Sequence, residues 1–172
     1  MVDCGSKIWL DGKLAPLASA GSVSILAHTL HYGVGAFEGL RAYRSERGET
    51  FIFRLREHIE RLLGSCKLVL IEPGVEREAL MDGCVEVLRQ NALPEAYLRP
   101  LVWLDAGAMG LSPRDNPVRS AILAWKWDTY LGADGLARGV RCKVSSYTRP
   151  HLGLGFARGK LTGQYVGSVL AK

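Results

Sequence analysis

The sequence lacks the features of a secreted, disulfide-stabilised or membrane-spanning protein. Its four cysteines, Cys4, Cys66, Cys84 and Cys142, lie far apart and form no CxxC pair, which argues against a zinc site and against a disulfide scaffold. No apolar run is long enough to cross a bilayer, and the segment MVDCGSKIWLDGKL lacks the basic-then-apolar pattern of a signal peptide. We therefore expect buried, reduced thiols, no membrane partner and a cytoplasmic location.

Composition and charge are close to those of an average globular protein. Of the 172 residues, 48% are hydrophobic and 23% are charged, so neither a disordered nor a fibrous chain is indicated. This length suits one domain, or one and a half, with a substantial core. The formal net charge is +5, but basic residues stand beside acidic ones, as in RLREHIERL. An anionic small molecule therefore accounts for the basic excess as well as a nucleic acid does.

The first half of the chain reads as strands followed by helices. KIWLDGKLAPL alternates apolar and polar residues around Asp11-Gly12, which predicts a hairpin with a tight turn. GAFEGLRAY and TFIF predict two further strands. The apolar period then becomes helical over residues 55–70 and again over 76–91. This order of elements predicts an α+β domain.

The second half of the chain predicts two central strands and the beginning of another domain. AYLRPLVWLD and RSAILAWKW are apolar on both faces, as in strands that are covered on each side. YLGADGLARG reads as a linker, VRCKVSSY as a strand, and the residues from Leu161 onward as a helix. We therefore divide the chain into a small α+β domain (1–130), a linker (131–139) and the start of a larger domain (140–172).

Lys160 lies among glycines at or just before the first turn of the last predicted helix. A helix N-terminus disfavours an ammonium group and so favours the neutral, nucleophilic amine. A solvated loop lysine is the simpler alternative, because that is where most lysines lie. From spacing alone, both interpretations stay open.

Tyr97 and Arg99 share one face of a predicted strand, because side chains of a strand repeat every two residues. A guanidinium with a neighbouring phenol suits a carboxylate ligand. An internal ion pair, for instance with Glu38, is an equally good interpretation, since a buried charge needs a partner that can also be protein.

Three other features are less informative. Arg61 lies four residues after Glu57 in the first predicted helix, which suggests a surface ion pair. His28 and His31 are too few for a metal site, and hydrogen bonds to backbone are the expected role of each. GLGFARG does not match the GxGxxG spacing of a phosphate loop. We expect no bound metal.

Several motifs in order resemble the branched-chain amino acid aminotransferases, which are fold-type IV enzymes that use pyridoxal phosphate. They are LHYGVGAFEGLRAY, FRLREHIERL, AYLRPLVW, AMGLSP, WDTYLGA and ARGKLTGQYVGSVLAK. The resemblance extends over nearly the whole chain from Lys7 onward. It implies a small mixed-sheet domain with two helices, followed by the first strand and helix of the larger cofactor domain.

The resemblance also assigns roles to residues near the cofactor. It implies that Lys160 forms the Schiff base with pyridoxal phosphate and shuttles the proton of the substrate α-carbon. Tyr165 would hydrogen-bond the phenolic oxygen of the cofactor, and Arg61 would bind its phosphate. Amino acids and 2-oxo acids are the implied partners, and nucleic acid is not among them.

Substrate recognition follows from the same resemblance. Tyr97 would meet the α-carboxylate and Arg99 the distal carboxylate of glutamate, between aromatic walls formed by Phe37, Trp127 and Tyr165. Tyr32 and the loop around Leu111 would reach into the site of a neighbouring subunit. The resemblance therefore implies a homodimer or a higher homo-oligomer.

Three alternatives remain open at this point. The Tyr-x-Arg pattern at 97–99 favours the branched-chain enzymes over D-amino acid aminotransferases and aminodeoxychorismate lyases of the same fold. A non-catalytic interaction module is a further alternative. Because the cofactor domain of the family continues well past Lys160, we expect an N-terminal fragment that is inactive at this length and leaves Leu161, Val169 and Leu170 exposed.

Overall fold

A seven-stranded sheet lies at the centre of the computed structural model, which describes residues 4–127, 132–148 and 156–172. The strands are β1 (Lys7–Leu10), β2 (Lys13–Pro16), β3 (Gly35–Phe37), β4 (Leu40–Arg44), β5 (Thr50–Ile52), β6 (Ala96–Leu104) and β7 (Val118–Trp125). Their order across the sheet is β2-β1-β7-β6-β4-β5, with β3 also paired to β6. Every strand pair is antiparallel. The α+β class predicted from the sequence is confirmed.

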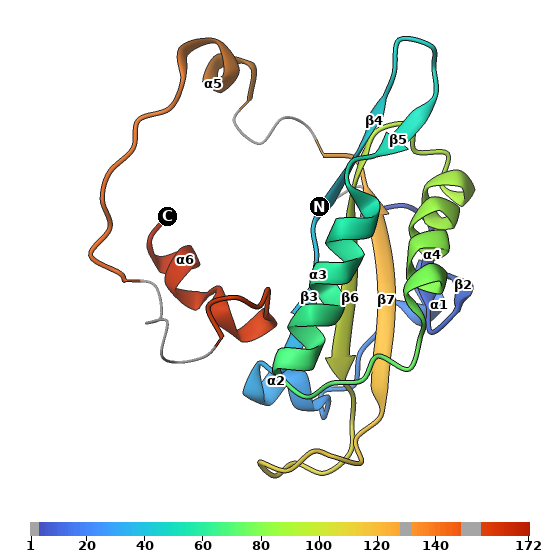
Figure 1. The fold of residues 1–172 in the computed structure, drawn as a ribbon, viewed down its shortest axis with the longest axis vertical. Coiled ribbons are helices and arrows are strands. Elements are labelled where there is room, and N and C mark those ends of the chain that lie inside the picture. Colours follow the sequence, from blue (N-terminus) through green and yellow to red (C-terminus); the bar gives the residue numbers. More distant parts are fainter. Residues whose placement is uncertain (1–3, 128–131, 149–155) are drawn as a thin grey trace.

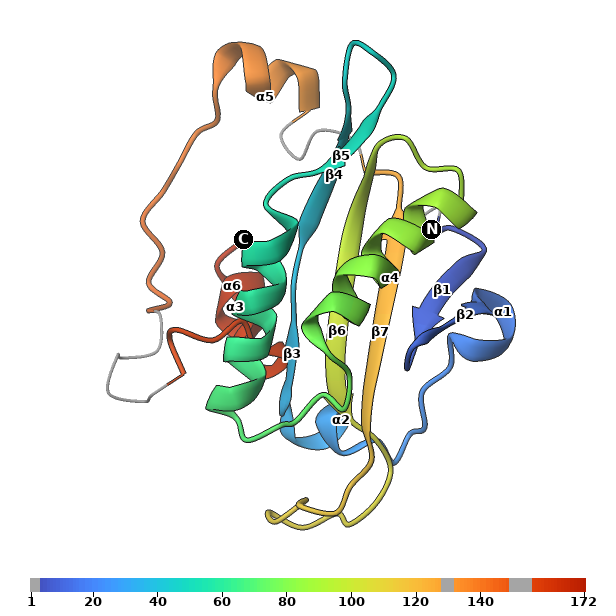
Figure 2. The same ribbon diagram turned by 45° about the vertical axis from the view of Figure 1, so that its right-hand side comes forward.

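Two long helices cover one face of this sheet (Figures 1 and 2). They are α3 (Leu55–Leu68) and α4 (Arg77–Gln90), close to the predicted ranges. Short helical segments are α1 (Leu17–Ala20), α2 (His28–Tyr32), α5 (Gly132–Arg138), the 3-10 turn η2 (Thr162–Gln164) and α6 (Val166–Leu170). Within the described residues, no helix is both long and apolar enough to traverse a membrane.

The main core lies between the sheet and the two long helices. Ile59 and Leu62 of α3 and Leu80 and Val87 of α4 are buried against Leu98 and its neighbours in the sheet. The helical spacing of these apolar positions explains why the helices were predictable, since one stripe of each helix faces the sheet. Cys66 and Cys84 are buried in this core as expected, whereas Cys142 is exposed.

We expect Leu98→Ala to lower the free energy of unfolding by about 2–5 kcal/mol, because Leu98 is a fully buried residue of β6 and the loss of its side chain leaves a cavity. Urea denaturation measures this change. Leu136→Ala in α5 is the matched control, since that leucine is exposed. Equal losses in the two variants would show that the core does not lie where the structure has it.

The second face of the sheet differs from the sequence prediction. β6 and β7 were expected to be covered on both faces, but the side chains of β6 alternate between buried and half-buried up to Leu101. A small cluster around Ala27, Trp103 and Ala121 covers only part of this face. The aromatic residues of β6 and β7 had suggested a buried strand, whereas several of them line an open surface.

Three other local predictions are wrong. GAFEGLRAY is not one strand, because it breaks between β3 and β4 at Glu38, whose N–H donates to Pro100 O. The histidines and glycines of HTLHYGVGAFEG predict a loop that leads into a strand, but residues 28–32 form α2. Residues 140–147, expected as a strand, form none.

The domain boundaries stay predictions. The expected linker contains α5, and residues 128–131 and 149–155 lie outside the described residues.

The C-terminal segment packs on the small domain beside β3 and α3 (Figure 2). Leu161 forms a β-bridge with Ala36, and Thr162 Oγ1 donates to Gly33 O at 2.8 Å. Leu161 is only 5% exposed, so its expected exposure is wrong, whereas Val169 and Leu170 are exposed as expected. A side chain at Gly33 would lie 2.8 Å from Gly163 Cα, so this crossing requires glycine.

Candidate active site

The backbone of Lys160 is fixed on both sides. Its N–H donates to Ser65 Oγ of α3 at 3.0 Å, and its carbonyl accepts from Phe37 N of β3 at 3.1 Å. Lys160 comes two residues before the 3-10 turn η2. The prediction that this lysine immediately precedes helical structure is therefore confirmed, although the first element is a single turn.

The side chain of Lys160 lies between two aromatic rings. Its Nζ is hydrogen-bonded to the hydroxyl of Tyr165 and lies 4.4 Å from the ring centroid of Phe37. The rings of Phe37 and Tyr165 are themselves 5.1 Å apart. Ring faces attract a cation, so this arrangement holds the amine at one place and leaves a phenol beside it for proton exchange.

Arg61 is paired with Glu38 and not with the expected Glu57. Arg61 Nε donates to Glu38 Oε1 at 2.5 Å and Nη2 donates to Oε2 at 2.8 Å, while His58 Nδ1 lies 2.8 Å from Oε2. Glu38 has no exposed surface, whereas the side chain of Arg61 is 53% exposed. Glu57 pairs with Arg54 instead.

Electrostatics favour the charged forms of this pair. Burial acts to raise the pKa of Glu38, but the hydrogen bonds from Arg61 and His58 outweigh it and hold that pKa below its ordinary value. The same hydrogen bond to Glu38 raises the pKa of Arg61. One edge of the guanidinium, formed by Nε and Nη2, is therefore held by Glu38, while the side chain as a whole is half exposed.

We expect the Glu38 pair to stabilise the protein at neutral pH and to fail in acid. Because the pKa of Glu38 is depressed, its contribution is present above the unfolded value near 4.5 and disappears as the pH falls through the lower folded value. Glu38→Gln should lower the free energy of unfolding by about 1.5–3 kcal/mol at pH 7. In urea titrations the difference from the parent protein should shrink below pH 4.5. A difference that is constant with pH, like that of the exposed Glu46→Gln control, would contradict this account.

Tyr97 and Arg99 lie together on the open face of β6, as predicted. Arg99 Nη2 donates to the Tyr97 hydroxyl at 3.3 Å, and its guanidinium carbon lies 4.7 Å from the Phe37 ring centroid and 5.6 Å from that of Trp125. Arg99 Nε is buried without a partner. The suggested pairing of Arg99 with Glu38 is wrong, since Glu38 faces Arg61.

Trp127 completes an aromatic group on the same face. Its ring lies 4.5 Å from that of Tyr97 and 5.8 Å from that of Trp125. Tyr97 packs so closely on Gly39 that a Cβ there would meet the Tyr97 hydroxyl at 1.8 Å. Phe37 contacts both the arginine and Lys160, so this aromatic group continues into the surroundings of the amine.

A cavity of about 910 Å³ brings the three residues with implied cofactor roles together. Its lining residues include Arg61, Lys160, Tyr165, Gly163 and Gly167. A cationic side chain, an amine and a phenol therefore surround one space. An anionic aromatic molecule matches this donor set, because a guanidinium prefers phosphate or carboxylate oxygens.

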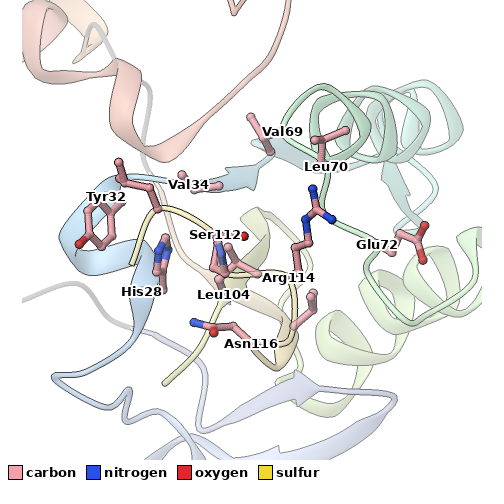
Figure 3. A pocket seen from close by; sticks show the side chains of 13 residues that line it. His28, Tyr32, Val34, Val69, Leu70, Glu72, Leu104, Ser112, Arg114 and Asn116 are labelled. Atoms are coloured by element: carbon pink, nitrogen blue, oxygen red, sulfur yellow. The ribbon is translucent and has the colours of Figure 1, made fainter. Parts of the chain in front are cut away.

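Tyr32 and Leu111 line a different cavity, of about 600 Å³, beside Val69 and Leu70 at the C-terminal end of α3. Figure 3 shows Tyr32 among the side chains that line this cavity. Tyr32 donates to Met109 O at 2.5 Å and stacks on the buried His28. His28 Nε2 lies 3.0 Å from Gly110 O, and His31 Nε2 lies 2.8 Å from Ile25 O. The expected hydrogen bonds of both histidines to backbone are confirmed.

The described part of the chain has no cluster of three metal-binding side chains.

The model of the class IV aminotransferase family matches residues 35–172. The chain belongs to the class IV aminotransferases. Among class IV relatives, the branched-chain-amino-acid aminotransferase of Pseudomonas aeruginosa is 38% identical over 99% of this chain and 55% of its own length. The Escherichia coli K12 enzyme is 36% identical over 95% and 52%. The chain thus spans about half the length of the curated relatives that it matches.

Solved class IV structures agree with the fold. The T.th. branched-chain amino acid aminotransferase with pyridoxamine 5'-phosphate superposes with a TM-score of 0.92 at 38% identity, over 100% of this chain and 56% of that one. The Escherichia coli enzyme gives a TM-score of 0.88 at 34% identity, over 96% and 54%. The T.th. enzyme has also been solved with N-(5'-phosphopyridoxyl)-L-glutamate and with 4-methylvaleric acid.

Sequence reasoning missed Glu38 as the partner of Arg61 and Ser65 as the partner of Lys160. Glu38 carries a signal in hindsight, because a carboxylate inside the apolar run GAFEG must find a buried cation. Ser65 carries none, since a serine in an amphipathic helix has no distinguishing pattern.

Proposed function

We propose that the full-length protein transfers the amino group between branched-chain L-amino acids and 2-oxoglutarate, with pyridoxal phosphate as its cofactor. The convergence of Lys160, Tyr165 and Arg61 on one cavity carries this proposal. The names and bound ligands of the relatives support it, since those proteins are branched-chain enzymes and one structure contains pyridoxamine 5'-phosphate.

The residues present fit the proposed cofactor. Arg61 would bind the phosphate through Nη1, because Glu38 already holds the opposite edge of its guanidinium. Tyr165 would donate to the phenolic oxygen, and Lys160 would attach to the aldehyde carbon. When bound, pyridoxal phosphate supplies an electron sink for the substrate α-carbon. Lys160 Nζ would then carry the proton between that carbon and the cofactor.

The open face of β6 would bind the substrate. Tyr97 would donate to the α-carboxylate, and Arg99, whose Nη2 lies 3.3 Å from the Tyr97 hydroxyl, would bind the distal carboxylate of glutamate. The aromatic walls from Phe37, Trp127 and Tyr165 suit the aliphatic side chains of leucine, isoleucine and valine. One site can therefore accept both substrate classes in turn.

We also propose a homodimer that works in the cytoplasm. Tyr32 and Leu111 lie away from the cavity of Lys160 and would serve the site of the second copy. The residues around them present an exposed apolar surface formed by Val23, Ile25, Leu26 and Leu30. All four cysteines are free, as is usual in a reducing compartment. Light scattering on the full-length protein measures the subunit number, and a monomer would contradict the dimer.

Borohydride reduction tests the central proposal. The full-length protein incubated with pyridoxal phosphate and then reduced should carry a covalent label on Lys160, as located by peptide mapping. Rates with L-leucine, D-alanine and aminodeoxychorismate should then favour L-leucine. Labelling at another lysine would contradict the assignment of Lys160. Preference for D-alanine or aminodeoxychorismate would indicate a related reaction of the same fold, and absence of both labelling and turnover would indicate an interaction module.

A further inference from the structure

Ser65 joins the two halves of the candidate active site through a single hydroxyl. It is 2% exposed and lies on α3, one helical turn after Arg61. Its Oγ donates to Arg61 O at 2.8 Å and accepts from Lys160 N at 3.0 Å. One buried atom therefore contacts the backbone of the proposed phosphate-binding residue and that of the proposed catalytic residue.

These two hydrogen bonds are part of a closed ring of hydrogen bonds and connecting chain segments, which we call the circuit. From Ser65 the circuit runs along α3 to the side chain of Arg61, which binds Glu38. Glu38 follows Phe37 in the chain, and Phe37 N donates to Lys160 O at 3.1 Å. The circuit returns through Lys160 N to Ser65. Each segment is held at two points, so the circuit fixes the backbone of Lys160 relative to the Glu38-bound guanidinium of Arg61, while the amine itself is held by the Tyr165 hydroxyl.

Without the Ser65 hydroxyl, the backbone of Lys160 would be held within the circuit only by the bond from Phe37 N of β3. The Lys160 N–H would lose its acceptor, whereas Arg61 would keep its bonds to Glu38. The amine would then move relative to the guanidinium, and a small displacement is enough to spoil a two-point attachment.

We infer that Ser65 is a positioning residue, which sets the spacing between Lys160 and Arg61 so that one phosphorylated aldehyde can engage both. This inference rests on the proposed function. A role in helix stability alone would leave the spacing unchanged, because a serine hydroxyl bonded to the carbonyl four residues earlier is dispensable for a helix.

A labelling ratio tests this inference without measuring turnover. The full-length protein, freed of cofactor, is incubated with pyridoxal 5'-phosphate or with pyridoxal, reduced with borohydride, and mapped for the label on Lys160. Only the phosphorylated aldehyde can use Arg61. Because pyridoxal partly closes to an internal hemiacetal, each rate ratio is divided by the ratio that a free lysine analogue gives with the same two probes. The corrected ratio reports how well the two residues cooperate, and a loss of folded protein cancels from it.

In the parent protein we expect pyridoxal 5'-phosphate to label Lys160 at least about tenfold faster than pyridoxal does. Binding of its phosphate to Arg61 raises the effective concentration of the aldehyde near the amine. Arg61→Ala should remove this advantage. Ser65→Ala should reduce the ratio at least about fivefold, through misplacement of the amine. Ser65→Thr, which keeps the hydroxyl, should restore most of it. Cys66→Ala, the matched control, removes the next buried side chain of α3 and should leave the ratio unchanged.

A double variant shows whether the two residues act together. In the Arg61→Ala background, Ser65→Ala should have no further effect on the ratio, because the spacing no longer matters. A parent ratio near one, or no label on Lys160, would overturn the proposed function. A high parent ratio that Ser65→Ala leaves unchanged would overturn the role of Ser65 alone.

Discussion

We expect Lys160→Arg to abolish the proposed transamination by the full-length protein while the fold is retained. Arginine keeps the positive charge between the rings of Phe37 and Tyr165, but a guanidinium neither loses its proton at neutral pH nor attaches to an aldehyde. Proton transfer by a positioned group contributes roughly 10²–10⁴ in rate, and the covalent attachment is lost as well. We therefore expect the rate with L-leucine to fall by roughly a thousandfold or more.

Stopped-flow and steady-state assays with L-leucine and 2-oxoglutarate measure this loss. Lys67→Arg is the matched control, since Lys67 is an exposed residue of α3 away from the cavity. Urea denaturation should show similar stability for both variants. Turnover by Lys160→Arg within about tenfold of the parent rate would mean that another residue moves the proton.

We expect Arg99→Ala in the full-length protein to raise the KM for glutamate, one of the proposed substrates, far more than the KM for leucine. The distal carboxylate of glutamate loses a charged hydrogen-bond partner worth about 1.5–3 kcal/mol, whereas an aliphatic side chain loses mainly packing. This corresponds to a change of roughly ten- to a hundredfold in KM for glutamate. Leucine should change only slightly, because Phe37 and Trp127 remain in place.

Initial rates with each amino donor measure the two constants. Arg47→Ala, an exposed position in the β4–β5 hairpin, serves as the control for the loss of a positive charge. Equal losses for glutamate and leucine would contradict the assignment of Arg99 to the distal carboxylate. They would indicate instead that Arg99 supports the aromatic group as a whole.

Elements determined by local sequence were predictable. The hairpin around Asp11-Gly12 forms because both residues adopt positive φ, which this turn requires. α3 and α4 follow the helical spacing of their apolar residues. The shared face of Tyr97 and Arg99 follows from the two-residue period of a strand. In each case, the information lies within a few residues of the chain.

Contacts between distant segments were not predictable from these patterns. Glu57 lies one turn from Arg61, and local spacing favoured that pair, but the buried Glu38 needs a cation more than an exposed glutamate does. The segment 140–147 has a strand-like composition but no neighbouring strand in the described residues. A strand needs a partner for its backbone hydrogen bonds, and composition alone does not supply one. The roles of Lys160 and Tyr165 came from the family resemblance, because spacing left them open.

The C-terminal segment docks on β3 through residues that are far apart in the sequence, and this affects the order in which contacts form during synthesis. Thr162 contacts Gly33 across 129 positions, and Lys160 contacts Ser65 across 95. Such contacts form slowly, because the intervening chain must first be ordered. During translation, the sheet and its two covering helices can assemble before Lys160 leaves the ribosome, with Arg61 already held by Glu38. The nascent chain would therefore have the proposed phosphate-binding residue in position before the proposed catalytic lysine is available.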